Sequence, residues 1–325
     1  MNRRELLRCG AAFVPALAAG PGRGQSSAFP TRPIRLLASS APGTLVDQAA
    51  RLYAERIGAY FKQPGVVDNV AGASTSLAAR QVIRSAPDGY TLMAAANTVV
   101  VAPMIIPNAG YGVQNFTAVG EMARAPGILV ISATSPYRNL RDLVAAAKAR
   151  PGAVSFGSSG IGSTNHLPVE LFARQAGVAF THVPYKGISL AVPDVMAGRV
   201  GFMMATATSI SGMIANGSLR PLAISSEVRS PAFPNVPTFQ EQGYSEGTSA
   251  VWIGMLGPAG LPPAVLASLA QALAAARADA SLLKRLEAAG QSVSNVRTPE
   301  QFAAELRREE ERVRRIVKEK NLALE

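Results

Sequence analysis

The sequence predicts an α/β protein in which helices flank sheets of mostly parallel strands. Short apolar runs alternate along the chain with stretches whose apolar residues recur at helical spacing. Turns rich in small residues join them, which is the pattern of repeated strand–turn–helix units. The chain has 325 residues, of which 48% are hydrophobic and 16% are charged. This length and composition predict a globular protein with room for two α/β domains.

The first 28 residues are predicted to be an export signal that is removed. Asn2–Arg8 is charged, and the apolar stretch of residues 9–19 is shorter than the roughly 20 residues that span a bilayer. The pair Arg3-Arg4 resembles a twin-arginine signal that lacks the following aromatic residue, so Sec export stays open. We therefore expect a periplasmic protein. Cys9 is the only cysteine, so no disulfide is expected in the mature chain.

Two strand–turn–helix units open the mature chain. The apolar run 33–38 predicts a strand, and apolar residues at helical spacing predict a helix over 45–60. A strand at 66–69 and a helix at 77–85 follow the same plan. A Pro-Asp-Gly turn then leads into a strand at 90–96, since proline sets φ and glycine accepts a positive φ.

The same alternation continues to the end of the chain. Strands are predicted at 128–132, 153–156, 180–183, 200–205, 222–225 and 251–256. Helices are predicted at 140–149, from 167 onward, at 188–197 and at 212–216, and three more at 263–276, 281–289 and 299–321. The last has apolar residues on one face and charges on the other, which indicates a helix packed along one side.

The glycine-rich turn at residues 157–167 is the strongest candidate for a binding site. It follows an apolar strand and opens a helix, an arrangement that aims free backbone N–H groups and a helix dipole at an anion. Ser159, Ser163 and Thr164 add hydroxyl donors. The turn is therefore predicted to form half of a clamp for a carboxylate.

Other site chemistries have little support in the sequence. The net charge of +11 comes from dispersed residues without interleaved aromatics, so no nucleic acid is expected. The two histidines, His166 and His182, do not predict a metal site without cysteines. The central turn has neither Gly-x-Ser-x-Gly nor the third glycine of a dinucleotide fingerprint. A hydrolase is therefore a weak alternative, and no cofactor is expected.

Short matches to one protein family run through almost the whole mature chain, and their joint occurrence in this order is specific. They are Phe29-Pro30-Thr31-Arg32-Pro33-Ile34, Pro42-Gly43 with Asp47, Ala86–Leu92, Ser158-Ser159-Gly160-x-Gly162-Ser163 with His166-Leu167, Val183–Gly187, Gly217-x-Leu219-Arg220, Arg229-Ser230-Pro231, Val236-Pro237-Thr238, Trp252-x-Gly254 and Pro258-Ala259-Gly260. With them the chain resembles the Bug/TctC family, the extracytoplasmic solute receptors of tripartite tricarboxylate transporters.

The resemblance implies a periplasmic-binding-protein type II fold, in which two domains close like a flytrap on a small organic acid. Each domain would hold a mixed, mostly parallel sheet flanked by helices. Domain 1 would comprise residues 29–129 and 252–325, and domain 2 residues 130–251, with the ligand cleft between them. The protein would be a monomer serving membrane subunits of the TctA/TctB type. A sensor kinase is the alternative partner, and neighbouring genes would distinguish the two.

In this family backbone N–H groups hold the ligand's carboxylates, and the matching turns here are Ala41–Thr44, Ala73–Thr75 and Ser159–Thr164. His166 suits a supporting hydrogen bond as well as ligand contact, and Tyr185 can pack instead of reaching the cleft. The predicted ligand-binding residues are Ala41, Gly43, Thr44, Asp47, Ala73, Ser74, Thr75, Asn97, Ser159, Gly160, Gly162, Ser163, Thr164, His166, Tyr185 and Thr206.

Four positions depart from the family pattern. Thr44 replaces a glycine of the first turn, and Ser74 and Thr75 replace glycines of the second. Ala205 stands where many members carry aspartate, which removes a partner for a ligand amine or hydroxyl. The added hydroxyls narrow the cleft, so no ligand of a better-known member is expected to transfer.

Overall fold

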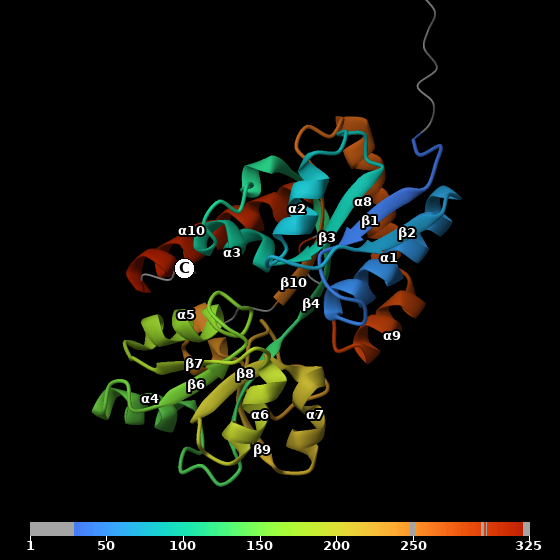
Figure 1. The fold of residues 1–325 in the computed structure, drawn as a ribbon. Coiled ribbons are helices and arrows are strands. Elements are labelled where there is room, and N and C mark those ends of the chain that lie inside the picture. The colour runs from blue at the N-terminus through green and yellow to red at the C-terminus, as the bar shows by residue number, and fades with distance from the viewer. Residues whose placement is uncertain (1–28, 248–250, 294–295, 297, 321–325) are drawn as a thin grey trace, which may run out of the picture.

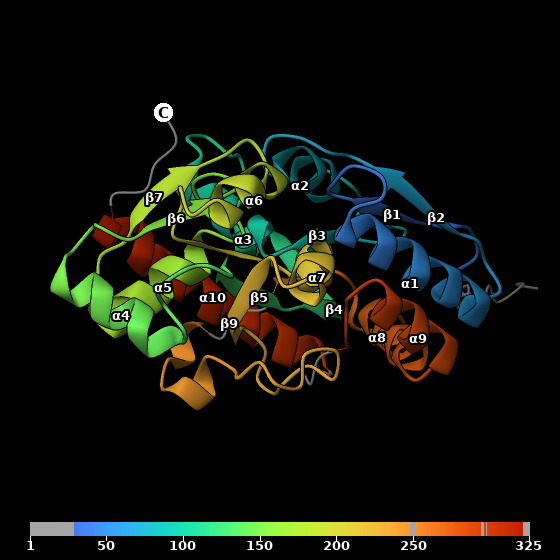
Figure 2. The same ribbon diagram turned by 90° about the horizontal axis from the view of Figure 1, so that it is seen from below.

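The computed structural model describes residues 29–247, 251–293, 296 and 298–320. The predicted export signal, residues 1–28, lies outside the described residues. Figure 1 shows two halves, each built around one five-stranded sheet with helices packed on it. We call them the first and the second lobe. Seen from below, the second lobe lies in front of part of the first, with α10 (Pro299–Lys320) running behind it (Figure 2).

The first lobe contains both ends of the described chain. Its strands are β1 (Ile34–Ala38), β2 (Gly65–Asn69), β3 (Thr91–Ala96), β4 (Phe116–Ala125) and β10 (Val251–Pro258), and its helices are α1 (Leu45–Phe61), α2 (Ser76–Ile83), α3 (Thr98–Ile105), α8 (Pro263–Arg277), α9 (Ala280–Ala288) and α10 (Pro299–Lys320). The strand order is β2-β1-β3-β10-β4. β1 pairs in parallel with β2 and β3, whereas β10 pairs antiparallel with β3 and β4. Four strands therefore run one way and β10 runs against them.

The second lobe repeats this arrangement. Its strands are β5 (Gly127–Ser132), β6 (Ser155–Ser158), β7 (Thr181–Pro184), β8 (Phe202–Thr206) and β9 (Leu219–Ile224), and its helices are α4 (Leu140–Ala149), α5 (Leu167–Ala176), α6 (Ile188–Met196) and α7 (Ala207–Ala215). The strand order is β7-β6-β8-β5-β9. β6 is parallel to β7 and β8, and β5 is antiparallel to β8 and β9.

Both faces of each sheet are buried under helices. In β1, Leu36 packs into a core with α1, α8 and α9, and the next residue, Leu37, packs with α2, α3 and α10. In β5, Leu129 packs with α4 and α5, and Val130 packs with α6 and α7. Strands buried on both faces are nearly continuous apolar runs, which explains why the sequence revealed them.

The structure confirms the α/β class and the mixed, mostly parallel sheets. Every predicted strand is present, with its ends within three residues of the prediction. The sequence analysis did not predict α3 and β4. An apolar run interrupted by Pro103 hides the helical period of α3, and the buried Glu121, paired with the partly buried Arg124, interrupts the apolar pattern of β4. The prediction of a helix only at 212–216 was wrong, because α7 already begins at Ala207, in a stretch whose Thr and Ser residues are typical of turns.

The lobes touch through three helices. Side chains of α3 and α10 from the first lobe and of α5 from the second form one apolar cluster. Arg174 of α5 also pairs with Glu319 of α10 at an N–O distance of 3.1 Å. In Figure 1, α3 and α10 lie on the side of the first lobe that faces α5. This contact places the turn at the start of α5 against the first lobe.

Candidate ligand-binding cleft

The turn between β6 and α5 is organised by Asn165. Its Oδ1 accepts hydrogen bonds from the N–H and the Oγ of Ser159, at 2.9 and 3.0 Å, and from the Oγ of Ser163, at 2.7 Å. Asn165 is 8% exposed. One side-chain carbonyl thus draws the two ends of the turn together. Asn165 was not among the predicted site residues. The sequence feature that could have identified it is an Asn just before a helix, a position where Asn side chains tend to form hydrogen bonds with the local backbone.

Two histidines support the same turn. The N–H of Gly162 donates to Nδ1 of His166 at 3.2 Å, and Ser158 Oγ lies 2.6 Å from Nε2 of His182. The two imidazole rings are 4.1 Å apart between centroids. Burial lowers the pKa of His182 below its ordinary 6.5, so this ring is neutral at pH 7. His166 is 1% exposed and positions the turn through its bond to Gly162.

The backbone N–H groups of this turn divide into those already used and those left for a ligand. Four of them, within Ser159–Ser163, donate to other groups of the turn. Within the described residues, the N–H groups of Ile161, Thr164 and Asn165 have no hydrogen-bond partner. They lie in the turn that leads into α5, where unpaired N–H groups and the helix dipole favour an anion.

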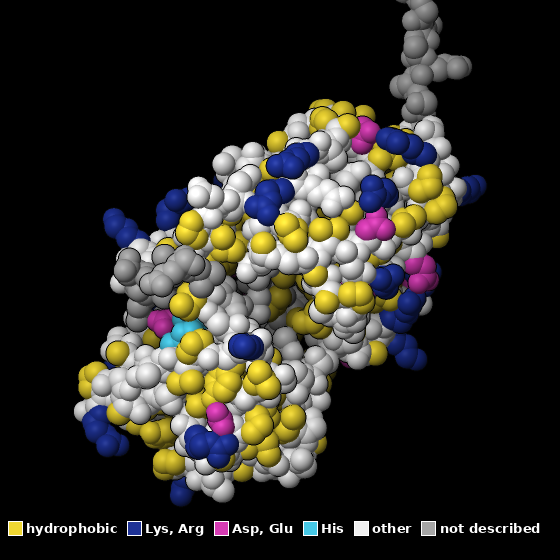
Figure 3. All heavy atoms as spheres, viewed as in Figure 1, with side chains coloured by type: hydrophobic (Ala, Val, Ile, Leu, Met, Phe, Trp, Pro, Cys, Tyr) yellow, Lys and Arg dark blue, Asp and Glu magenta, His cyan; other side chains and the backbone are white. Residues whose placement is uncertain are grey.

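A cavity of about 180 Å³ lies beside Thr164. Its walls come from the β6–α5 turn, the start of α6, the end of β8 and the first residues of β5 and β10. Figure 3 shows the molecular surface hollowed between the two lobes, with hydrophobic side chains at the edge of the hollow. The strand ends of open α/β sheets are where such folds bind ligands. The cavity and the unpaired N–H groups therefore coincide at one place.

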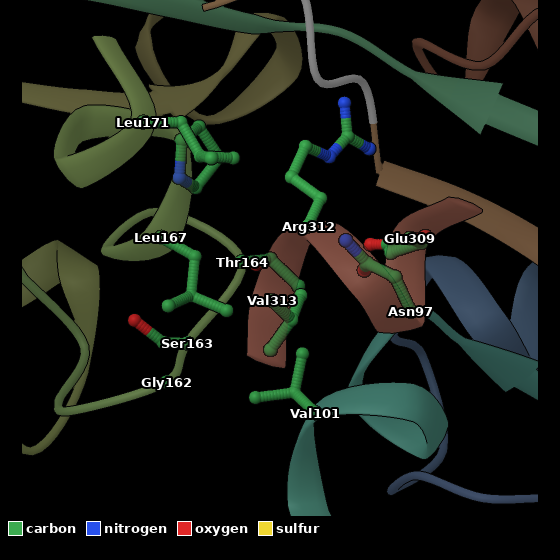
Figure 4. Close-up of a pocket in the computed structure, with 11 residues that line it drawn as sticks. Asn97, Val101, Gly162, Ser163, Thr164, Leu167, Leu171, Glu309, Arg312 and Val313 are labelled. Atoms are coloured by element: carbon green, nitrogen blue, oxygen red, sulfur yellow. The ribbon is translucent and has the colours of Figure 1, made fainter. Parts of the chain in front are cut away.

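A smaller cavity lies on the other side of Thr164, between the β6–α5 turn and the first lobe (Figure 4). Its volume is about 10 Å³, which is room for roughly one water molecule. Asn97, at the end of β3, and Arg312 of α10 line it from the first lobe. Asn97 is 6% exposed, and its Oδ1 has no hydrogen-bond partner within the described ranges. Burial raises the pKa of the neighbouring Glu309, to which Trp252 donates its indole N–H.

The turn between β1 and α1 contains the same glycine hydrogen bond, but its acceptor is a carboxylate. Gly43 donates its N–H to Asp47 Oδ2 at 2.8 Å, four residues on, as Gly162 does in the second lobe. Asp47 is 3% exposed and accepts further bonds from Asn69 and Arg51. Burial opposes its ionisation, but these hydrogen bonds outweigh it and hold the pKa of Asp47 below the ordinary 3.8. Asp47 therefore orients the turn as an ionised carboxylate.

The turn between β2 and α2 is strained. Ala73, Ser74 and Thr75 have consecutive φ values of 45, 46 and 80°. A left-handed conformation costs a residue with a side chain roughly 1–2 kcal/mol, and residues held in it concentrate at functional sites. The Thr75 hydroxyl lies 2.9 Å from that of Thr98, which ties the turn to α3.

The structure brings six of the predicted residues to the two cavities. Ser159, Thr164 and Thr206 line the larger one. Asn97, Gly162 and Ser163 line the smaller one, where Thr164 also contributes. The other ten line neither cavity: Ala41, Gly43, Thr44, Asp47, Ala73, Ser74, Thr75, Gly160, His166 and Tyr185.

Tyr185 shows how one of these ten is used. Its hydroxyl donates to Asp194 Oδ2 at 2.5 Å, and its ring packs with the core of α6 and α7. The contribution of all ten residues to ligand binding stays a prediction.

The larger cavity also has walls that the sequence analysis did not assign to the site. Besides Asn165, they are Gly127, Ile188, Met204, Ala205 and Val251. The sequence analysis singled out Ala205 only as a departure from the family pattern. Nothing in their residue types indicates a ligand, because an apolar wall and an apolar core have the same composition.

Two α/β lobes that share one strand order, with hydrogen-bond donors at a cavity where they meet, define a two-lobed solute-binding protein. Residues 49–322 match the model of the tripartite tricarboxylate transporter family receptors, TctC. The chain belongs to this family.

Relatives and solved structures agree with the family. A protein of Pseudomonas sp. strain P51, the "UPF0065 protein in tcbD-tcbE intergenic region", is 33% identical over 99% of this chain and 96% of its own. A solved periplasmic transporter is similar at TM-score 0.74 and 33% identity, covering 92% of this chain and 100% of that one. The R. palustris protein Rpa4515, solved with adipate, is similar at TM-score 0.72 and 30% identity, covering 89% and 97%.

Proposed function

We propose that this protein captures a small carboxylate-bearing metabolite in the cleft between its lobes and closes on it. The observation that carries the proposal is the coincidence of the unpaired Thr164 and Asn165 N–H groups with the cavity of about 180 Å³. The adipate bound to the R. palustris relative supports the ligand class.

The second lobe would hold the anion first, and the first lobe would complete the cage. We infer that residues 29–129 with 252–325 and residues 130–251 form the two domains, which hinge at β5 and β10, the strands that follow the two crossings between the lobes. On closure, the turns Ala41–Thr44 and Ala73–Thr75 would approach the ligand, and the strained second turn would present its N–H groups. A hydrogen bond to a charged group contributes roughly 1.5–3 kcal/mol. Four to six of them, less the cost of immobilising the ligand, reach the roughly 8 kcal/mol of a micromolar complex.

The protein would act in the periplasm as a monomeric receptor without catalytic activity. Its family consists of transporter receptors, and one solved relative is a periplasmic transporter protein. No helix within the described ranges is long and apolar enough to cross a membrane. Residues 1–28 would direct export by the twin-arginine or the Sec route. Membrane subunits of the TctA/TctB type would receive the ligand.

Calorimetry on the mature protein with mono-, di- and tricarboxylates and with sugars tests the proposal. We expect one-to-one binding of at least one carboxylate, and binding of sugars alone would refute the ligand class. Gly160→Val should abolish binding, because a residue with a side chain is strained at the φ of 112° that Gly160 adopts and would change the shape of the turn. No neighbour lies within 4 Å of an added Cβ, so the packing around the turn should stay intact. Gly177→Val, at φ 63° and equally open at the other end of α5, is the matched control. If Gly160→Val keeps full affinity, the turn is not the clamp.

A further inference from the structure

Most of the free hydrogen-bond donors of the larger cavity lie in one turn, between β6 and α5. Thr164 contributes an N–H and a hydroxyl, and Asn165 contributes an N–H, none of which has a partner within the described residues. These donors come from one turn, so they can serve one carboxylate group. Its two oxygens accept about four hydrogen bonds at most, which this group of donors nearly satisfies.

Three other polar groups around the cavity have already committed their hydrogens, whereas the side-chain NH2 of Asn165, in the same turn as the free donors, has no partner within the described residues. Ser159 Oγ donates to Asn165 Oδ1 at 3.0 Å, and Thr206 Oγ1 donates to Ser209 Oγ at 3.1 Å. The N–H of Gly127 donates to Ser225 Oγ at 2.8 Å. Thr206 can therefore accept a hydrogen bond from a ligand but has no hydrogen left to donate to a second carboxylate.

The rest of the wall is apolar. Ile188, Met204, Ala205 and Val251 face the cavity, and none of its lining residues in the described ranges is charged. Residues 248–250, which precede Val251, are Thr, Ser and Ala and also carry no charge. A second carboxylate placed here would lose its water and gain no cation, with only the backbone amides at the start of α6 as free donors, which is costly.

The volume sets the size of the apolar part of the ligand. A dry cavity of about 150 Å³ in another protein takes up benzene, and this one measures about 180 Å³. It therefore has room for one six-membered ring with a carboxylate attached.

We propose that the ligand is a monocarboxylate with a compact apolar body the size of one ring, the class of benzoate. The proposal rests on the function proposed above and narrows its substrate class. The carboxylate binds at the N–H groups of Thr164 and Asn165, and the ring lies against Met204, Ala205 and Ile188. A second acid group or a row of hydroxyls lowers the affinity.

Matched ligands test this class on the mature wild-type protein by calorimetry. Benzoate and terephthalate share one ring and differ by a second carboxylate, so benzoate should bind at least ten-fold more tightly. Benzamide, which lacks the charge, should bind at least ten-fold more weakly than benzoate.

Three outcomes would contradict the inference. The start of α6 at Ile188 also has free helix amides, and if they bind a second carboxylate, the affinity for terephthalate will equal or exceed that for benzoate and overturn the inference. If adipate or malate binds and benzoate does not, the inference fails while the proposed function stands. If no carboxylate binds, both fail.

A matched pair of variants tests the apolar wall. Ala205→Asp places a carboxylate in the cavity and should weaken benzoate binding at least ten-fold. Ala207→Asp makes the same change two residues later, outside the cavity lining, and should leave affinity within two-fold. Ala205 is 2% exposed, so thermal unfolding must first show that its variant is folded. If it is not, Ala205→Ser replaces it, with an expected two- to five-fold loss. Unchanged benzoate affinity in a folded variant at position 205 would remove this wall from the site.

Discussion

The two lobes share a topology but differ in the charge of their equivalent turns. Each sheet has three parallel strands, then one antiparallel strand that follows a crossing between the lobes, then a fifth strand. In each lobe a glycine at positive φ, Gly43 or Gly162, donates its N–H to a side chain four residues later. That acceptor is a carboxylate in the first lobe, Asp47, and an imidazole in the second, His166.

This difference shows which lobe is suited to hold an anion. The ionised Asp47 places a buried negative charge beneath the first-lobe turn, only partly offset by Arg51, whose side chain is 53% exposed. In the second-lobe turn an imidazole replaces this carboxylate, and the carboxylate of Glu170 lies 3.8 Å from its Nε2, the ring nitrogen opposite the one that bonds to Gly162. Both turns therefore keep their shape by the same bond, but only in the first is the acceptor of that bond itself a carboxylate, which repels an anion at the turn.

The largest effect that we expect is a difference in stability between alanine variants of the two glycines. An added Cβ at Gly162 would lie 2.2 Å from Ile105 Cδ1 of the first lobe, whereas at Gly43 nothing lies within 4 Å. Both have a positive φ, which costs an alanine roughly 1–2 kcal/mol, and overpacking adds about 1–3 kcal/mol at Gly162 alone. Urea unfolding should show Gly162→Ala less stable than Gly43→Ala by at least about 1 kcal/mol. Equal losses would mean that the contact between α3 and the turn is loose.

Transplanting the charge tests the comparison directly. His166→Asp puts the first lobe's acceptor into the second-lobe turn, where it can still accept the Gly162 N–H but adds a buried negative charge near the ligand. Benzoate affinity should fall at least ten-fold, with a smaller loss at high salt because screening weakens the repulsion. His166→Asn retains an uncharged acceptor and is the control. An equal loss in both variants would assign the effect to the shape of the turn.

The lobes should also respond to acid in different pH ranges. Because the pKa of His182 is lowered in the folded protein, the unfolded chain binds more protons below pH 6.5, and the free energy of unfolding falls as the pH drops below that value. The lowered pKa of Asp47 makes its contribution disappear only below its ordinary 3.8. The free energy of unfolding, measured with urea between pH 7 and pH 5, should therefore depend less on pH in His182→Gln than in the wild-type protein. In Asp47→Asn its dependence on pH over this range should equal that of the wild type. The reverse result would contradict the assignment.

The smallest effect is expected from removing the first-lobe charge. Asp47→Asn keeps an oxygen that can accept the Gly43 N–H but lacks the negative charge. Affinity for benzoate should rise about two- to three-fold, because the carboxylate acts across the cleft and solvent screens it. Calorimetry at low and at high salt checks this, since the gain should shrink as salt is added. A loss of affinity would show that Asp47 contributes to binding through the turn that it orients.

Much of the fold was readable from the sequence because most strands are buried on both faces. The first strand, predicted at 33–38, and α4, predicted at 140–149, match the structure to within one residue. The pattern failed where apolar periodicity is absent or interrupted, as in α3 with its internal proline and in β4 with its buried, ion-paired Glu121. The β6–α5 turn was found because glycines and hydroxyl residues at a helix start have a distinctive chemistry. The twin topology was hidden, since the two lobes share an order of strands without a repeat of residues.

The sequence by itself determined the α/β class, the family and the turn that offers hydrogen bonds to an anion, because local patterns and motifs carry that information. Only the tertiary structure decided which of that turn's N–H groups remain unpaired, since Asn165, Ser158 and His166 take up others from within the fold. It alone also placed Ile188, Met204 and Ala205 around one cavity. These residues come from separate elements, and an apolar side chain has the same chemistry in a core as in a ligand site, so only its position in space tells the two apart.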